Sequence, residues 1–235
     1  AQGLPRATQD LDFFVSPEIE NLEALKRALF MLFDDPSVQA IRLMELRGWL
    51  AQQKKHELLQ DIYLITGRGL TSNVYLLGKT KLTLIDTGND SQPNTIITDL
   101  HNSHLTIYDI KQIIITHTHF DHIGGLLELL KYISPTVYVH QKEQSKLSTI
   151  LGTKQVTTIH DGDVLSTEIG SLQAHHTPGH SPGAICLYDQ ARRILYSGDT
   201  VFPNGLFGRC DLNGGDTNAL IQSLHHLSTL DTDIL

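Results

Sequence analysis

The pattern of apolar and polar positions changes between the first 55 residues and the rest of the chain. Apolar residues recur at helical spacing from Ile19 to Leu32. Ser16 and Pro17 precede this run as an N-cap and a proline at the first helical position. A second helical stretch is predicted over residues 38–53. We therefore expect residues 1–55 to form a short helical N-terminal segment and residues 56–235 to form a separate domain.

Short β-rich runs separated by glycines replace the helical pattern from about Asp61 onward. The run 111–116 is almost continuously apolar, which is typical of a strand buried on both faces. The predicted strands are 62–66, 74–77, 82–85, 111–116, 136–140, 164–167, 171–175, 184–188 and 194–196. The predicted helices are 93–105, 125–132, 141–148 and 217–230.

Composition narrows the class of protein. The chain has 235 residues, of which 40% are hydrophobic and 19% charged, and these values exclude bulk disorder. No apolar run is long enough to span a bilayer, and no signal peptide is visible. Two cysteines favour a reducing compartment, so we expect a cytoplasmic protein without a membrane partner. The net charge of −8 argues against a nucleic-acid partner. The oligomeric state stays open.

A histidine-rich motif follows the apolar run 111–116. The chain contains 13 histidines, and several gather here. His117 and His119 are two residues apart, so in extended backbone their side chains project to the same side. Asp121 and His122 follow in the predicted turn. Three imidazoles and one carboxylate suit zinc, iron or manganese, and a polar surface turn is the alternative interpretation.

Three further polar residues follow predicted strands and could complete such a site. His180 lies in the loop Thr177–Gly183, between two strands. Asp199 follows the strand 194–196, and Asp86 follows the strand 82–85. Each of them alone is an ordinary turn or strand end. Asp86 could orient a ligand histidine through a hydrogen bond, or could cap a turn.

Taken together, these motifs resemble the metallo-β-lactamase superfamily. The pattern H-x-H-x-D-H, a later lone histidine and the aspartate of S-G-D-T occur in the same order as in that family, from about Asp61 to the C-terminus. The resemblance implies an α+β fold, an αββα sandwich of two mixed β-sheets flanked by helices. It also implies two zinc ions, with iron or manganese as alternatives. By this resemblance, His117, His119 and His180 are ligands of the first metal, and Asp121 and His122 are ligands of the second. Asp199 is then the bridging carboxylate, and Asp86 is the structural aspartate near the site.

The segments Phe202–Gly205, Phe207–Leu212 and Gly214–Asp216 are similar to those of short glyoxalase II-like hydrolases. This resemblance implies thioester hydrolysis of the hydroxyacylglutathione hydrolase type. A metal-bound hydroxide would attack the small-molecule substrate, and Asp121 would be the catalytic residue that orients it. Arg209 could bind an acidic group of the substrate. A loop salt bridge is an equal alternative for Arg209.

The chain departs from the family near its end. The family carries one more histidine after the last helix, in a Pro-Gly-His-type loop, and this sequence stops at Leu235 before such a loop. His225 and His226 lie inside the last predicted helix, where we expect surface residues. The second metal position is therefore predicted to be weakened, and the domain is predicted to be truncated.

Other functions stay open. A mononuclear iron enzyme similar to persulfide dioxygenases is the first alternative, because two histidines and a carboxylate suit iron. A lactonase, a phosphodiesterase or a catalytically idle binding module are further alternatives. Near the N-terminus, Asp10 and Asp12 resemble the D-x-D strand of a minimal nucleotidyltransferase domain. About fifty residues cannot form that domain, so we interpret this segment as an inactive fragment.

Overall fold

The computed structural model describes residues 59–67, 69–89, 92–151, 156–202 and 205–232. The predicted helical segment 1–55 and its nucleotidyltransferase-like motif lie outside the described residues. In the described part, no helix is both long enough and apolar enough to cross a membrane.

The larger sheet has six strands in the order β1-β2-β3-β4-β5-β6. Their bounds are β1 Ile62–Ile65, β2 Val74–Leu77, β3 Leu82–Ile85, β4 Ile110–Ile115, β5 Thr136–His140 and β6 Val156–Ile159. The first three strands pair antiparallel, and β3 to β6 pair parallel. Parallel neighbours need crossover connections, which here contain α4 Gln92–Asn102, η2 Ile107–Asp109, α5 Phe120–Ile123, α6 Leu126–Leu129 and α7 Gln144–Leu151.

The smaller sheet has four strands in the order β10-β9-β8-β7. Their bounds are β7 Val164–Thr167, β8 Gly170–His176, β9 Ile185–Asp189 and β10 Ile194–Tyr196. All of its pairs are antiparallel, so the prediction of two mixed sheets is wrong for this sheet. The reason is that no crossover helix separates these consecutive strands. A two-stranded ribbon, β11 Val201–Phe202 and β12 Leu206–Phe207, and the helix α8 Thr217–Leu227 follow.

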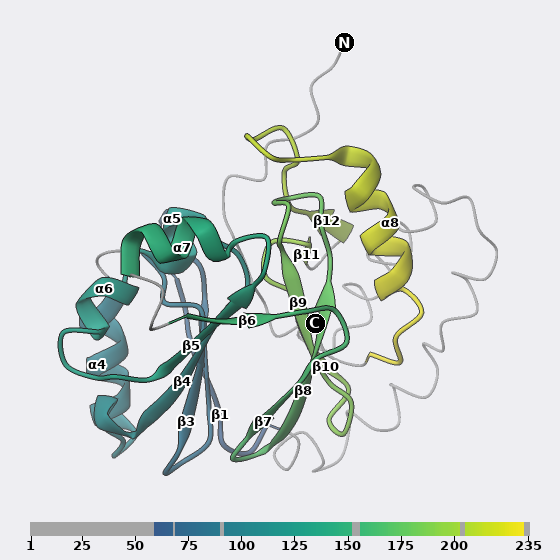
Figure 1. Cartoon of the computed structure of the whole chain (residues 1–235). Coiled ribbons are helices and arrows are strands. Elements are labelled where there is room, and N and C mark those ends of the chain that lie inside the picture. The colour runs from purple at the N-terminus through teal and green to yellow at the C-terminus, as the bar shows by residue number, and fades with distance from the viewer. Residues whose placement is uncertain (1–58, 68, 90–91, 152–155, 203–204, 233–235) are drawn as a thin grey trace.

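Alternating side chains divide the core into layers. Ile113 and Ile115 of β4 belong to the cluster that packs against α4 and α6, whereas Ile114 belongs to the cluster between the two sheets. In β9, Cys186 and Tyr188 face the cluster of α8. The result is a sandwich of helices, sheet, sheet and helix, with α4 to α7 on one outer face and α8 on the other (Figure 1). The predicted αββα class is confirmed.

The structure adds elements that the apolar pattern does not reveal. The strand β6 has the sequence VTTI with only its last residue fully buried, so its pattern is too weak to predict a strand. The strands β11 and β12 have two residues each. The short helix α5 occupies the place of the predicted turn and contains Asp121 and His122.

Candidate metal centre

The predicted site residues gather at one edge of the sandwich, where strands of both sheets end. His117 and His119 follow β4, and Asp86 follows β3, its parallel neighbour. His180 lies in the loop between β8 and β9, and Asp199 follows β10. Parallel β3 and β4 present their carboxyl ends at the same edge. A backbone hydrogen bond from Ile185 N to Thr116 O ties the start of β9 to the end of β4.

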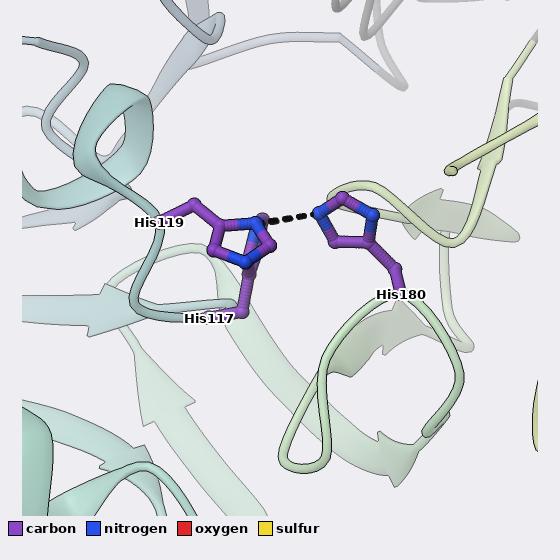
Figure 2. Close-up of side chains that lie close together, drawn as sticks. All are labelled: His117, His119 and His180. Atoms are coloured by element: carbon purple, nitrogen blue, oxygen red, sulfur yellow. Dashed lines mark hydrogen bonds between the residues drawn. The ribbon is translucent and has the colours of Figure 1, made fainter. Parts of the chain in front are cut away.

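Three imidazoles converge on one point. His117 Nε2 lies 3.0 Å from His119 Nδ1, and His180 Nε2 lies 2.8 Å from His119 Nδ1 and 3.1 Å from His117 Nε2. Figure 2 shows that the rings approach one another from two separate loops. Four-coordinate zinc with nitrogen at about 2.0–2.1 Å places its ligand atoms about 3.3 Å apart. The observed spacing is close to that value.

A second group adjoins the first. His122, Asp199 and His117 have ligand atoms within 4.8 Å of one another. Asp199 connects the two groups, because its Oδ1 lies 3.1 Å from His122 Nε2 and its Oδ2 lies 3.2 Å from His180 Nε2. Asp121 lies nearby, with Oδ2 3.8 Å from His122 Nε2. Asp199 thus lies between the two groups, with one oxygen near a histidine of each.

Hydrogen bonds fix the ring orientation of two of the histidines. His122 Nδ1 lies 2.8 Å from Asp86 Oδ2, and His180 Nδ1 lies 2.7 Å from the carbonyl oxygen of Arg209. A carbonyl can only accept, so the His180 Nδ1–H donates and Nε2 keeps its lone pair toward the centre. Asp86 likewise accepts at Oδ2, which leaves His122 Nε2 directed at Asp199.

Burial sets the charge of the imidazoles. Burial, and then repulsion by neighbouring histidines, lowers the pKa of His117 well below its ordinary value and the pKa of His119 to about 4. Burial also lowers the pKa of His180. Burial opposes the charge of His122 as well, but the carboxylates of Asp199 and Asp86 raise the pKa of His122. His117, His119 and His180 are therefore neutral at pH 7, as metal ligands must be.

A buried glutamate that sequence reasoning missed supports both loops. Glu143 accepts hydrogen bonds from Thr118 Oγ1, from Ser181 Oγ at 2.8 Å and from Gly183 N at 3.1 Å. Burial opposes ionisation, yet these hydrogen bonds and Lys146 lower the pKa of the Glu143 carboxyl. No motif around Glu143 points to this position, because its partners lie far away along the sequence.

The segment after β12 contacts the centre through its backbone. The Arg209 guanidinium binds both oxygens of Asp211, at 2.7 and 2.8 Å, and is half-exposed. This ion pair is the alternative that the sequence left open for Arg209. A Cβ at Gly208 would lie 1.7 Å from Asp199 O and 3.1 Å from His180 Nδ1, so only glycine fits there. His225 and His226 lie exposed on α8, as predicted, and His226 contacts His175.

The chemistry of these residues fits a transition metal. His122 Nε2 is buried and has no hydrogen-bond partner of acceptable geometry among the described residues, although Asp199 lies close. The raised pKa of His122 favours a proton on Nε2, and a bound cation would take the place of that proton while Nδ1 keeps its hydrogen bond to Asp86. Imidazole nitrogens and carboxylate oxygens are ligands for zinc, iron and manganese. The donor set thus suits a transition-metal ion, and the two groups share His117.

Comparisons with known proteins agree with the fold. A family model described as the metallo-beta-lactamase superfamily matches residues 67–235. A probable metallo-hydrolase, YqgX of Bacillus subtilis, is 37% identical over 126 residues, which cover 48% of this chain and 59% of that protein. A hydroxyacylglutathione hydrolase of Francisella tularensis subsp. novicida is 33% identical over 125 residues, covering 53% of this chain and 47% of that protein. The chain therefore matches about half of the length of these relatives.

Solved structures show the same fold. The B3 metallo-beta-lactamase BLEG-1 has a TM-score of 0.57 and is 32% identical, covering 70% of this chain and 83% of its own. TTHA1623, in a di-iron-bound form, has a TM-score of 0.58 and is 30% identical, covering 70% of this chain and 85% of its own. The family model covers most of this chain, and the described residues contain the histidine and aspartate cluster. The chain therefore belongs to the metallo-beta-lactamase superfamily of metal-binding hydrolases.

Proposed function

We propose that this chain hydrolyses thioesters of the hydroxyacylglutathione type, with zinc at two adjoining positions. The observation that carries the proposal is the position of Asp199, whose two oxygens lie at 3.1 Å from His122 Nε2 and 3.2 Å from His180 Nε2. In that place Asp199 would help to hold an ion at each of the two positions. The similarity to a Francisella hydroxyacylglutathione hydrolase supports the choice of substrate class.

The bound metal would polarise the thioester carbonyl and lower the pKa of a water molecule to near neutrality. The protein's own residues supply orientation. His117, His119 and His180 hold the first position with neutral nitrogens. Asp121 lies at the rim of the second position, where its carboxylate would accept the proton of the attacking water.

The leaving group needs little help from the protein. An alkyl thiol has a pKa of about 8–9, so its thiolate departs without a strong general acid. Arg209 lies in the segment that contacts His180, and we assign its guanidinium to an acidic group of the substrate, in exchange for Asp211. A thioester of a cellular thiol agrees with a reducing, cytoplasmic location, and neither Cys186 nor Cys210 forms a disulfide within the described residues.

An assay of S-lactoylglutathione hydrolysis, in which the released thiol is measured, tests this proposal. The zinc-loaded chain should turn over the thioester, and the variant His117→Ala should lose at least about 100-fold in kcat/KM, because a ligand is removed. The matched control is His101→Ala, at an exposed histidine in the last turn of α4. Full activity of the His117 variant, or no activity of the zinc-loaded chain, would contradict the proposal.

One observation favours a second candidate. His117, His122 and Asp199 form a group of two histidines and one carboxylate, which is a set used by non-haem iron oxygenases. An iron-dependent persulfide oxidation would use this group alone. Oxygen uptake with glutathione persulfide by the iron-loaded chain, without thioester hydrolysis by the zinc-loaded chain, would favour this candidate. Absence of both activities would favour a binding module.

A further inference from the structure

Glu143 is a carboxylate with no exposed surface that lies between the two loops carrying the ligands of the first metal position. Its Oε2 accepts the hydroxyl hydrogen of Thr118, and its Oε1 accepts from Ser181 Oγ at 2.8 Å and from Gly183 N at 3.1 Å. The one cation in contact among the described residues is Lys146, whose Nζ lies 3.3 Å from Oε2. The carboxylate thus has partners at both of its oxygens.

The partners of Glu143 are neighbours of the ligand histidines in sequence. Thr118 lies between His117 and His119, and Ser181 directly follows His180. The Thr118 loop follows β4 of the larger sheet, and the Ser181 loop joins β8 and β9 of the smaller sheet. A single side chain therefore joins a loop of one sheet to a loop of the other, beside the point where their imidazoles meet.

A buried carboxylate is costly unless hydrogen bonds compensate for its lost hydration. An apolar side chain would fill the same volume without that cost. None of the described hydrogen bonds of Glu143 goes to a metal-ligand atom, so we assign it no step of the reaction. Its bonds to both loops give it a geometric task, and residues that hold metal ligands in place in this way affect metal affinity by about 10–100-fold.

The loop at Gly183 is shaped around the Glu143 side chain. A Cβ at Gly183 would lie 2.6 Å from Glu143 Cγ and 3.1 Å from His140 Nδ1. Glycine is thus required for the close approach that lets the Gly183 N–H reach Oε1. Backbone and side chain are fitted to one another at this point.

We propose that Glu143 is a positioning residue that sets the spacing between the His117–His119 loop and the His180 loop, and so sets the affinity of the first metal position. This inference depends on the proposed function only for the presence of a metal at that position. The bonds to Thr118 and Ser181 act through geometry, because neither hydroxyl belongs to a ligand side chain.

Zinc affinity measured by competition with a chromogenic chelator tests the inference. The variant Glu143→Ala should bind zinc at the first position about 10–100-fold more weakly. The variant Glu143→Gln should stay within about threefold of the parent chain, because its Oε1 still accepts from Ser181 and Gly183 and its amide can donate to Thr118 Oγ1. The visible absorption of the cobalt-substituted protein should change in the alanine variant and be restored in the glutamine variant.

A control variant distinguishes positioning from loss of stability. Glu168 also accepts several hydrogen bonds, from the backbone N–H groups of Lys79, Thr80 and Lys81. It caps the β2–β3 turn, at the end of β3 opposite to Asp86. Glu168→Ala should lower the melting temperature and leave zinc affinity and the cobalt spectrum unchanged. If Glu143→Ala does not fold, Thr118→Val and Ser181→Ala each remove one of the hydroxyl donors and should each weaken zinc binding.

The outcomes separate this inference from the proposed function. Unchanged zinc affinity and an unchanged cobalt spectrum in Glu143→Ala would overturn the positioning role, whatever the enzyme hydrolyses. Equal losses in the glutamine and alanine variants would also overturn it, because they would indicate a need for charge instead of geometry. A parent chain that binds zinc without hydrolysing S-lactoylglutathione would contradict the function alone, and the affinity test would still decide the role of Glu143.

Discussion

Asp86 holds His122 by a 2.8 Å contact between Oδ2 and Nδ1, while its Oδ1 accepts from Thr116 N at 2.8 Å. Asp86 adopts a positive φ of 59°, in the left-handed region that aspartate tolerates better than most residues. The same carboxylate therefore joins the ends of β3 and β4 and orients the His122 ring of α5. The bond to Thr116 needs an acceptor at Oδ1, and the bond to His122 needs an acceptor at Oδ2.

Replacement of Asp86 by asparagine tests this orienting role. One acceptor oxygen remains for Thr116 N, but the amide group then faces His122 Nδ1–H, and two donors oppose one another. We expect metal affinity at the second position to fall by about 10–100-fold. The control is Asp99→Asn, on α4. Isothermal titration with zinc measures both variants, and equal affinity of the Asp86 variant and the parent would refute the role.

The two metal positions are expected to fill separately. The first combines three neutral imidazoles whose ligand atoms lie within 3.1 Å of one another. The second has His122 and Asp199, with Asp121 Oδ2 at 3.8 Å from His122 Nε2. Zinc titration of the metal-free chain against a chromogenic chelator should show two steps. A single step with two equally tight ions would show that another residue completes the second position.

Two buried tyrosines should differ in how loss of the hydroxyl changes the free energy of unfolding. Tyr196 OH is buried and has no hydrogen-bond partner among the described residues, whereas Tyr188 OH donates to Asp231 O at 2.7 Å. Tyr196→Phe should be neutral or stabilise by up to about 1 kcal/mol, and Tyr188→Phe should destabilise by about 1 kcal/mol. Urea unfolding of both variants measures these values. Marked destabilisation by Tyr196→Phe would reveal a partner for its hydroxyl.

The free energy of unfolding should fall as the pH is lowered, because the unfolded chain takes up a proton at His140 more readily than the folded chain does. Burial, and then repulsion by His176, Lys142 and His160, lowers the pKa of His140 to about 4, against an attraction from Glu143. Because the unfolded chain binds this proton near pH 6.5 and the folded chain only near pH 4, stability is lost as the pH falls through that window. Solvent screening limits this loss to about 1 kcal/mol.

Urea unfolding at several pH values checks this expectation. The variant His140→Asn keeps an acceptor for Lys142 N and removes the titrating ring. Its stability should vary less between about pH 6.5 and pH 4 than that of the parent chain. The exposed His101→Asn variant is the control and should follow the parent. If the His140→Asn variant still showed the full loss in acid, that loss would belong to other groups.

Much of the fold was predictable because its central strands carry strong local patterns. The run Ile113–Ile115 is fully buried as its apolar sequence indicates, and the predicted bounds 74–77, 82–85, 136–140 and 164–167 match β2, β3, β5 and β7. The ribbon β11–β12 was not predicted, because strands of two residues each are too short to show an alternating pattern. The strand β6 was missed because only its last residue is fully buried.

Some residues of the candidate site were indicated by a local motif, and Glu143 was not. The motif around His117 and the placement of His180 and Asp199 after strands drew attention to them, and the structure brings them together. Glu143 carries no such signal, because its partners in the two loops lie 25 to 40 residues away in sequence. The ligand role of every one of these residues stays a prediction for the metal experiments.

The hydrogen bond from His180 to the backbone carbonyl of Arg209 has a consequence for redesign. Every residue at position 209 offers the same carbonyl oxygen, so the side chain can be exchanged without removing the acceptor that orients His180. Gly208 must stay, because any Cβ there would collide with Asp199 O. Substitutions of the side chain at position 209 are thus expected to leave the orientation of the His180 ring unchanged.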